Sequence, residues 1–269
     1  MGELDRALAH DDFPDGADMS LAALLSAGSM ARYFELAESG ALRARTAADP
    51  TMASTASTRV RVDCLAILAR AGRVPAELPE RPAMPVLKEP VGARQRSLLS
   101  GRLAAHARGA GTTPARLRLF AVIGVVLDTG ARAGELCAMR LQDLGPDRET
   151  IVVTRRPQAR SVTPPVRETV PLSAPTRAAL RWWLDARQEL VQHVQGTATA
   201  VWVSVRPNHA GVNRLDGDPQ PRPAGMPLMP RGLARAYTRA IVELNAEMAG
   251  RTGWTPLPTR LEQLRRGID

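Results

Sequence analysis

The chain has 269 residues, of which 44% are apolar, and a formal net charge of +9 at pH 7. This length suits one large or two smaller globular domains, and the longest apolar run, residues 119–127, is too short to cross a bilayer. The acidic N-terminus has no apolar signal core. We therefore expect a cytoplasmic protein with no membrane partner.

Cysteine and histidine residues are few and scattered. Cys64 and Cys137 lie in apolar helical patterns and are expected to be reduced core residues, and the four histidines show no ligand spacing. The sequence therefore predicts no metal site and no cofactor.

The charge is divided unevenly along the chain. Residues 1–90 carry 10 basic and 13 acidic side chains, whereas residues 91–269 carry 26 basic and 14 acidic ones. Of the 36 basic residues only Lys88 is a lysine, which codon bias in a GC-rich genome would also explain. Because arginine binds phosphate with two donors, a basic domain of this size favours a polyanion as partner.

The acidic residues 1–18 predict a flexible tail, which is followed by a helical domain over residues 19–72. Helices are expected at 20–28, 29–45 and 51–71. Four apolar residues recur at helical spacing in the third helix and predict its buried stripe: Val60, Cys64, Ile67 and Leu68.

Prolines interrupt the chain after the third helix. Five of them stand at positions 75, 79, 82, 85 and 90, so residues 73–92 predict an extended linker. A second domain follows over residues 93–269, in which helices dominate. Its expected elements are helices at 93–107, 114–128, 133–141, 175–195 and 230–249, strands at 150–155 and 168–173, and a Pro/Gly-rich loop at 206–229.

The stretch TGARAGEL, residues 129–136, ends an apolar helix and begins another. Arg132 follows the break, and Glu135 comes three residues later. An ordinary helix start and a phosphate clamp both explain this pattern.

This box and the order of the elements resemble the tyrosine recombinase (phage integrase) family, from about residue 20 to the end. In that family a helical core-binding domain is linked to a catalytic domain, and the two surround DNA. The resemblance implies a fold that is mainly α with a small antiparallel sheet, with a core-binding-like domain before a catalytic-like one. It also implies a protein that is associated with the nucleoid when DNA is bound.

The family's first arginine box aligns with residues 129–136. The resemblance implies that Arg132 holds the scissile phosphate and that Glu135 steadies its guanidinium. Asp143 falls where the family commonly has an aspartate before its sheet. The family's lysine, at the end of the first strand, is replaced by Arg156 or, as the alternative, Arg155, and neither is a good proton donor. An arginine that merely borders the hairpin would fit the same pattern.

The family's His-x-x-Arg box aligns with the segment TPLPTRLEQL, residues 255–264. Arg260 would be the second phosphate-binding arginine, and Leu257 occupies the place of the histidine. The family's nucleophilic tyrosine lies beyond this box, and the second domain is expected to lack that segment. Tyr33 and Tyr237 are both expected to be packing residues.

Three functions are compatible with these residues. The first is a DNA-binding relative of the integrases that keeps its phosphate-binding arginines, at positions 132, 155, 156 and 260, but is catalytically inactive. The second is a working recombinase whose nucleophile comes from another subunit or from a C-terminal part absent from this chain. The third is a protein–protein interaction module with a vestigial site. The expected partner is double-stranded DNA, with a second copy or another recombinase subunit as a further partner.

Overall fold

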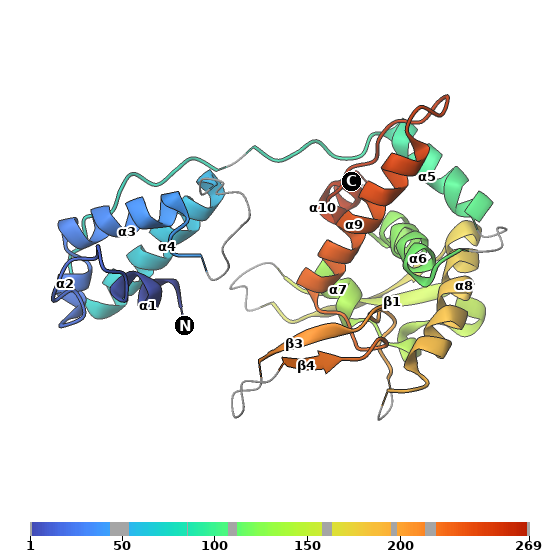
Figure 1. Cartoon of the computed structure of the whole chain (residues 1–269). Coiled ribbons are helices and arrows are strands. Elements are labelled where there is room, and N and C mark those ends of the chain that lie inside the picture. Colours follow the sequence, from blue (N-terminus) through green and yellow to red (C-terminus); the bar gives the residue numbers. More distant parts are fainter. Residues whose placement is uncertain are drawn as a thin grey trace. The chain divides into compact units, whose positions relative to one another are not determined.

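The computed structural model describes residues 2–43, 54–84, 86–106, 112–157, 163–194, 198–212 and 219–267. They form two compact units, Met1–Leu87 and Lys88–Asp269, which are described separately. Helices predominate in both (Figure 1), and the second contains two antiparallel sheets of two strands each. The expectation of a mainly α fold with a small antiparallel sheet is confirmed. No helix among the described residues combines the length and the apolar character that crossing a membrane requires.

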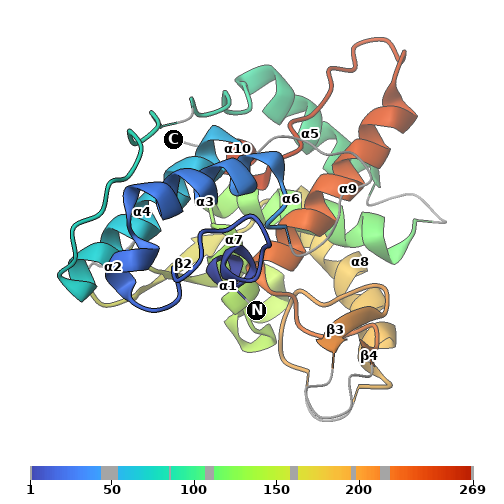
Figure 2. The same ribbon diagram turned by 60° about the vertical axis from the view of Figure 1, so that its left-hand side comes forward.

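Serine residues cap the N-termini of three helices in the first unit. Ser20, Ser26 and Ser54 each accept a hydrogen bond from a backbone N–H in the first turn that follows. The two longest helices, α3 and α4, lie side by side in both views (Figures 1 and 2). The helices of this unit are α1 (Glu3–Leu8), α2 (Leu21–Leu24), α3 (Ala27–Ser39) and α4 (Thr55–Gly72).

The N-terminal stretch is folded, which corrects the expectation of a flexible tail over residues 1–18. Its apolar residues Ala7, Phe13 and Ala17 are buried in the core of the first unit. The carboxylate of Glu3 lies 2.6 Å from Nε of Arg61, and so ties α1 to α4. The acidic composition suggested a flexible tail because the apolar residues are few and widely spaced. Burying them lowers the free energy enough to hold the stretch against the core, while its acidic neighbours stay in water.

The buried face of α4 also differs from the expected one. Val62, Leu65 and Ala69 face the core, whereas Val60 is 59% and Ile67 49% exposed. Cys64, expected in the core, is also exposed. The helix carries apolar residues at helical spacing on two faces, and periodicity alone does not show which of them faces the core.

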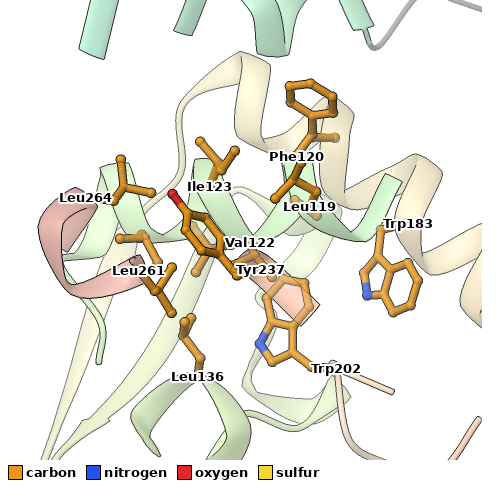
Figure 3. Close-up of a cluster of buried hydrophobic side chains, with 14 of the residues drawn as sticks. Leu119, Phe120, Val122, Ile123, Leu136, Trp183, Trp202, Tyr237, Leu261 and Leu264 are labelled. Atoms are coloured by element: carbon orange, nitrogen blue, oxygen red, sulfur yellow. The ribbon is translucent and has the colours of Figure 1, made fainter. Parts of the chain in front are cut away.

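The second unit is built around α6 (Pro114–Thr129), which is buried on most sides. Thr113 caps its first turn, and its side chains Leu119 and Ile123 join Trp202 and Leu264 in one core (Figure 3). Around it pack α5 (Ala93–His106), α8 (Ala174–Val191), α9 (Pro230–Met248) and α10 (Leu261–Arg265).

A hairpin follows the short helix α7 (Ala133–Ala138) and two 3-10 turns, Leu141–Asp143 and Pro146–Arg148. Strand β1 (Thr150–Arg155) pairs with β2 (Val166–Pro171), so that Thr150 lies opposite Pro171 and Arg155 opposite Val166. The hairpin therefore delivers the end of β1 to α7, the helix with which β1 is in contact.

A second hairpin lies in the segment that the sequence predicts as a loop. Strand β3 (Asn208–Val212) pairs with β4 (Pro219–Arg222). Proline at two positions of β4 made the sequence pattern predict a loop here, because proline lacks the N–H that a central strand needs. A two-stranded ribbon tolerates it, since each strand has one unpaired edge.

Candidate functional site

Arg132 owes its position to a sharp break between two helices. Gly130 ends α6 in the left-handed region, at φ 63°, and its N–H donates to the carbonyl of Val126 at 2.8 Å. Thr129 steadies the turn, because its hydroxyl oxygen accepts a hydrogen bond from the N–H of Ala131. Arg132 then stands immediately before the first turn of α7, with an extended backbone. The helix start is therefore real, and it sets the position of Arg132.

Glu135 is the buried centre of this site, with only 5% of its side chain exposed. Its carboxylate accepts hydrogen bonds from two backbone N–H groups, that of Arg132 at 2.9 Å and that of Arg156 at 3.3 Å. It also lies 3.8 Å from Nη1 of Arg132 and 3.4 Å from Nη1 of Arg155. A buried carboxylate requires such partners, so Glu135 fastens α7 to the end of β1.

The two arginines at the end of β1 have different roles. Arg155 has three partners: it donates to the carbonyl of Thr129 at 2.5 Å and pairs with Glu168 at 2.6 Å as well as with Glu135. The side chain of Arg156 is exposed, and its carbonyl accepts a hydrogen bond from Nη1 of Arg132 at 3.0 Å. Of the two alternatives for the lysine position, Arg156 is the one whose guanidinium faces solvent.

An open cleft lies over this network. Four arginines line it, from the start of α7, the end of β1 and α10, and with them a single carboxylate. The lining residues are Thr129, Gly130, Arg132, Glu135, Arg155, Arg156, Pro157, Thr163, Pro164, Val166 and Arg265. Four guanidinium groups around one cleft can donate hydrogen bonds to an anion with several oxygens.

The arginine that α10 contributes to the cleft is Arg265, which the sequence did not single out. Arg260 stands just before the first turn of α10, is exposed, and is not among the residues that line the cleft. The two candidates are five residues apart, more than one turn of helix. The pair Leu261 and Leu264, both buried, was the available signal, because it fixes which face of α10 turns inward.

Leu257 is 3% exposed and belongs to the core. Its backbone is held on both sides by Asn245, whose side chain donates to the Leu257 carbonyl and accepts from the Leu257 N–H, each at 2.8 Å. An apolar residue therefore suits the surroundings at the position where the resemblance implies a histidine.

Asp143 has a structural role at the base of the hairpin. One carboxylate oxygen accepts from the N–H of Arg140 at 2.9 Å, and the other lies 3.1 Å from Nη2 of Arg167 on β2. Asp143 thus ties the 3-10 turn after α7 to the second strand.

The side chains of Tyr33, Tyr237 and Cys137 are wholly or partly buried. Tyr237, 4% exposed, lies in the core of the second unit (Figure 3), donates to the carbonyl of Pro258, and burial raises its pKa. In the first unit, burial and the neighbouring Glu3 raise the pKa of Tyr33 to about 12. Burial likewise raises the pKa of the Cys137 thiol to about 11. None of these groups is available as an anion near neutral pH.

Residues 101–260 match the model of the phage integrase family. No curated protein sequence matches the chain. Among solved structures, the XerA recombinase is 17% identical, with a TM-score of 0.41 over 80% of this chain and 61% of that one. The Tn1549 transposon integrase, in complex with circular intermediate DNA, is 13% identical, with a TM-score of 0.45 over 100% of this chain and 85% of that one. A lambda integrase tetramer bound to a Holliday junction is 14% identical, with a TM-score of 0.38 over 96% of this chain and 59% of that one. The chain thus spans less than two thirds of the XerA and lambda integrase chains.

Proposed function

Since this chain belongs to the phage integrase family, we propose that it binds double-stranded DNA through backbone phosphates at the arginine-lined cleft. In this proposal Arg132 is the central phosphate ligand, and the residues of this chain do not themselves cleave the strand. The observation that carries the proposal is the Glu135 network, which holds the backbone of Arg132 and of Arg156 on one buried carboxylate.

The network matters because a free arginine side chain loses conformational entropy when it binds. Arg132 is fixed by its own backbone bond to Glu135 and by its guanidinium bond to the carbonyl of Arg156. Its side chain is nevertheless 38% exposed, so donors remain within reach of a ligand in the cleft. Pre-organised and partly exposed guanidinium groups are what phosphate binding requires.

A second basic surface supports the proposal. Arg231, Arg235 and Arg239 are all exposed and recur every four residues along α9, so they share one side of that helix. None of the three forms an ion pair with any residue that the structure describes. A row of uncompensated arginines with a rise of about 6 Å per step suits contact with successive phosphates of a strand.

Strand cleavage in this family would need a phenol that attacks phosphorus, an acid that protonates the leaving oxygen, and cations that stabilise the transition state. The cleft provides only the last of these. Tyr33 and Tyr237 are both buried, Leu257 cannot transfer a proton, and arginine is a poor acid. The proposal is therefore binding without covalent attachment by this chain's own residues.

Titration of a short DNA duplex against the wild type and Arg132→Ala tests the proposal. The wild type should bind with a log affinity that falls linearly with log salt, and Arg132→Ala should weaken binding about tenfold. Arg177→Ala is the control, because Arg177 forms an exposed ion pair with Glu149 and does not line the cleft. Weak binding that is indifferent to Arg132→Ala would instead indicate an interaction module with a vestigial site.

A suicide DNA substrate separates binding from catalysis. The proposal expects no covalent adduct between this chain and the cleaved strand. An adduct that forms only when a second recombinase is added would show that the nucleophile is supplied in trans, and would make the protein part of a working recombinase.

A further inference from the structure

A forked ion pair lies on α10 beside the cleft. Arg265 donates from Nε to both carboxylate oxygens of Glu262 at 3.1 Å, and from Nη2 to one of them at 2.6 Å. The Arg265 side chain is 17% exposed and that of Glu262 53%. A cleft-lining arginine is thus held by a partner that is itself open to solvent.

The position of this pair is set by the packing of α10. Leu261 and Leu264 are buried in the core. After the helix, Gly267 approaches the backbone so closely that a Cβ there would lie 2.5 Å from the Val91 carbonyl oxygen. The N–H of Val91 in turn donates to the carbonyl of Gln263 at 3.0 Å. Because α10 is anchored at both ends, Arg265 must meet a ligand through its side chain, without movement of the helix.

The charges around Glu262 favour its ionised form. Hydrogen bonds from Arg265 lower the pKa of Glu262 most, and the fields of Arg266 and Arg132 lower it further. Glu262 is therefore an anion close to two arginines that line the cleft. A carboxylate and a phosphate each present two oxygens to a guanidinium fork, so the two compete for the same donors.

We propose that Glu262 is a displaceable internal anion: its carboxylate occupies the fork of Arg265 in the free protein, and a DNA backbone phosphate takes that fork over when the cleft is filled. Arg265, and not Arg260, is then the second phosphate-binding arginine of the cleft. The half-exposed Glu262 side chain can turn into solvent when it is displaced. This inference rests on the proposed function, and it adds a competitor that lowers affinity until DNA is bound.

The test uses the two partners of one ion pair, which should change DNA affinity in opposite directions. Glu262→Gln should tighten binding of a short duplex about fivefold at low salt, because the fork loses its charged competitor. Arg265→Gln should weaken binding about tenfold and lower the magnitude of the salt slope by about 0.9, the value for one phosphate contact.

Two controls accompany the pair. Arg260→Gln should leave affinity within about twofold of wild type, since Arg260 does not line the cleft. Glu149→Gln removes the same charge from the exposed pair that Glu149 forms with Arg177 at 2.8 Å, and should also stay within about twofold. If Glu149→Gln tightens binding as much as Glu262→Gln, only net charge matters and the inference is wrong.

Other outcomes also decide the question. Loss of binding in Arg260→Gln with no effect of Arg265→Gln would overturn the inference, as would weaker binding in Glu262→Gln. If Arg265→Gln proves unfolded by circular dichroism, the half-exposed Glu262→Gln variant decides alone. A failure of the proposed function gives another result: the wild type would not bind DNA, or Arg132→Ala would bind DNA as well as the wild type does.

Discussion

The carboxylate of Glu135 accepts a hydrogen bond of 2.9 Å from the backbone N–H of Arg132, three residues before it in the chain. This bond caps α7, and it also fixes the residue whose guanidinium lines the cleft. The same carboxylate reaches Arg155, the last residue of β1, and the N–H of Arg156, which follows it. One buried side chain therefore couples the stability of the unit to the geometry of its candidate site.

Replacement of Glu135 by glutamine should affect both. Loss of the charge leaves the buried face of Arg155 and the guanidinium of Arg132 without their shared anion, at a cost of about 3 kcal/mol in the free energy of unfolding. Urea denaturation measures this cost, and duplex titration should show a loss of affinity similar to that of Arg132→Ala. Glu149→Gln, in an exposed pair, should change the free energy of unfolding by less than about 1 kcal/mol. A Glu135→Gln variant with wild-type stability would show that the network is not coupled to the fold.

A histidine at position 257 should not restore catalysis. Leu257 is buried in the core, where an imidazole loses apolar contacts and leaves polar atoms unpaired, so Leu257→His should lower the free energy of unfolding by about 2 kcal/mol or more. Leu257→Met conserves volume and should cost less than about 1.5 kcal/mol. The suicide-substrate assay on Leu257→His should again give no adduct. A covalent product would mean that the absence of the histidine alone had prevented strand cleavage.

Sequence patterns predicted the second unit better than the first, for a physical reason. The helix over residues 114–129 and the strand at 150–155 carry strong local signals: a capping threonine, a glycine in the left-handed region, and a β-branched run. The arginine box at residues 129–136 depends on the same turn, and so it could be located by spacing. The folding of residues 1–18 depends on contacts with helices distant in the chain, which periodicity does not encode.

The site itself divides in the same way. Arg132 and Glu135 are neighbours in sequence, and their contact follows from one helix start. The arrival of Arg265 at the cleft depends on where α10 begins and which of its faces is buried, so it could be found only in three dimensions. The family motif predicts a phosphate-binding role for Arg260, and the proposal for Arg265 is the alternative to that prediction.

The face of α4 that meets the core can be tested with two substitutions on one helix. Leu65 is buried, and Leu65→Ala should lower the free energy of unfolding of the first unit by about 2–5 kcal/mol through a lost contact and a cavity. Ile67, 49% exposed, was expected in the core, and Ile67→Ala should cost less than about 1 kcal/mol. Hydrogen exchange of the α4 amides reports both effects. If Ile67→Ala lowered the free energy of unfolding more than Leu65→Ala, the buried face would be the one that periodicity predicted.

Alkaline pH should destabilise the first unit through Tyr33. Burial and the nearby carboxylate of Glu3 raise the pKa of this phenol from 10.0 to about 12 in the folded chain. Because the folded pKa is raised, the contribution to stability is complete below pH 10 and is lost as the pH rises toward 12, with a slope of at most about 1.4 kcal/mol per pH unit.

Absorbance of tyrosinate measures this directly. In the folded protein neither tyrosine should ionise near pH 10, since burial also raises the pKa of Tyr237, whereas in urea both should. Tyr33→Phe should remove the alkaline loss of protection in the amides of α1 and α3, because it deletes the titrating group. Tyr237→Phe, in the other unit, should leave that loss unchanged. Normal ionisation of Tyr33 in the folded chain would mean that α1 does not cover it in solution, and that the N-terminal stretch is the free tail its composition predicts.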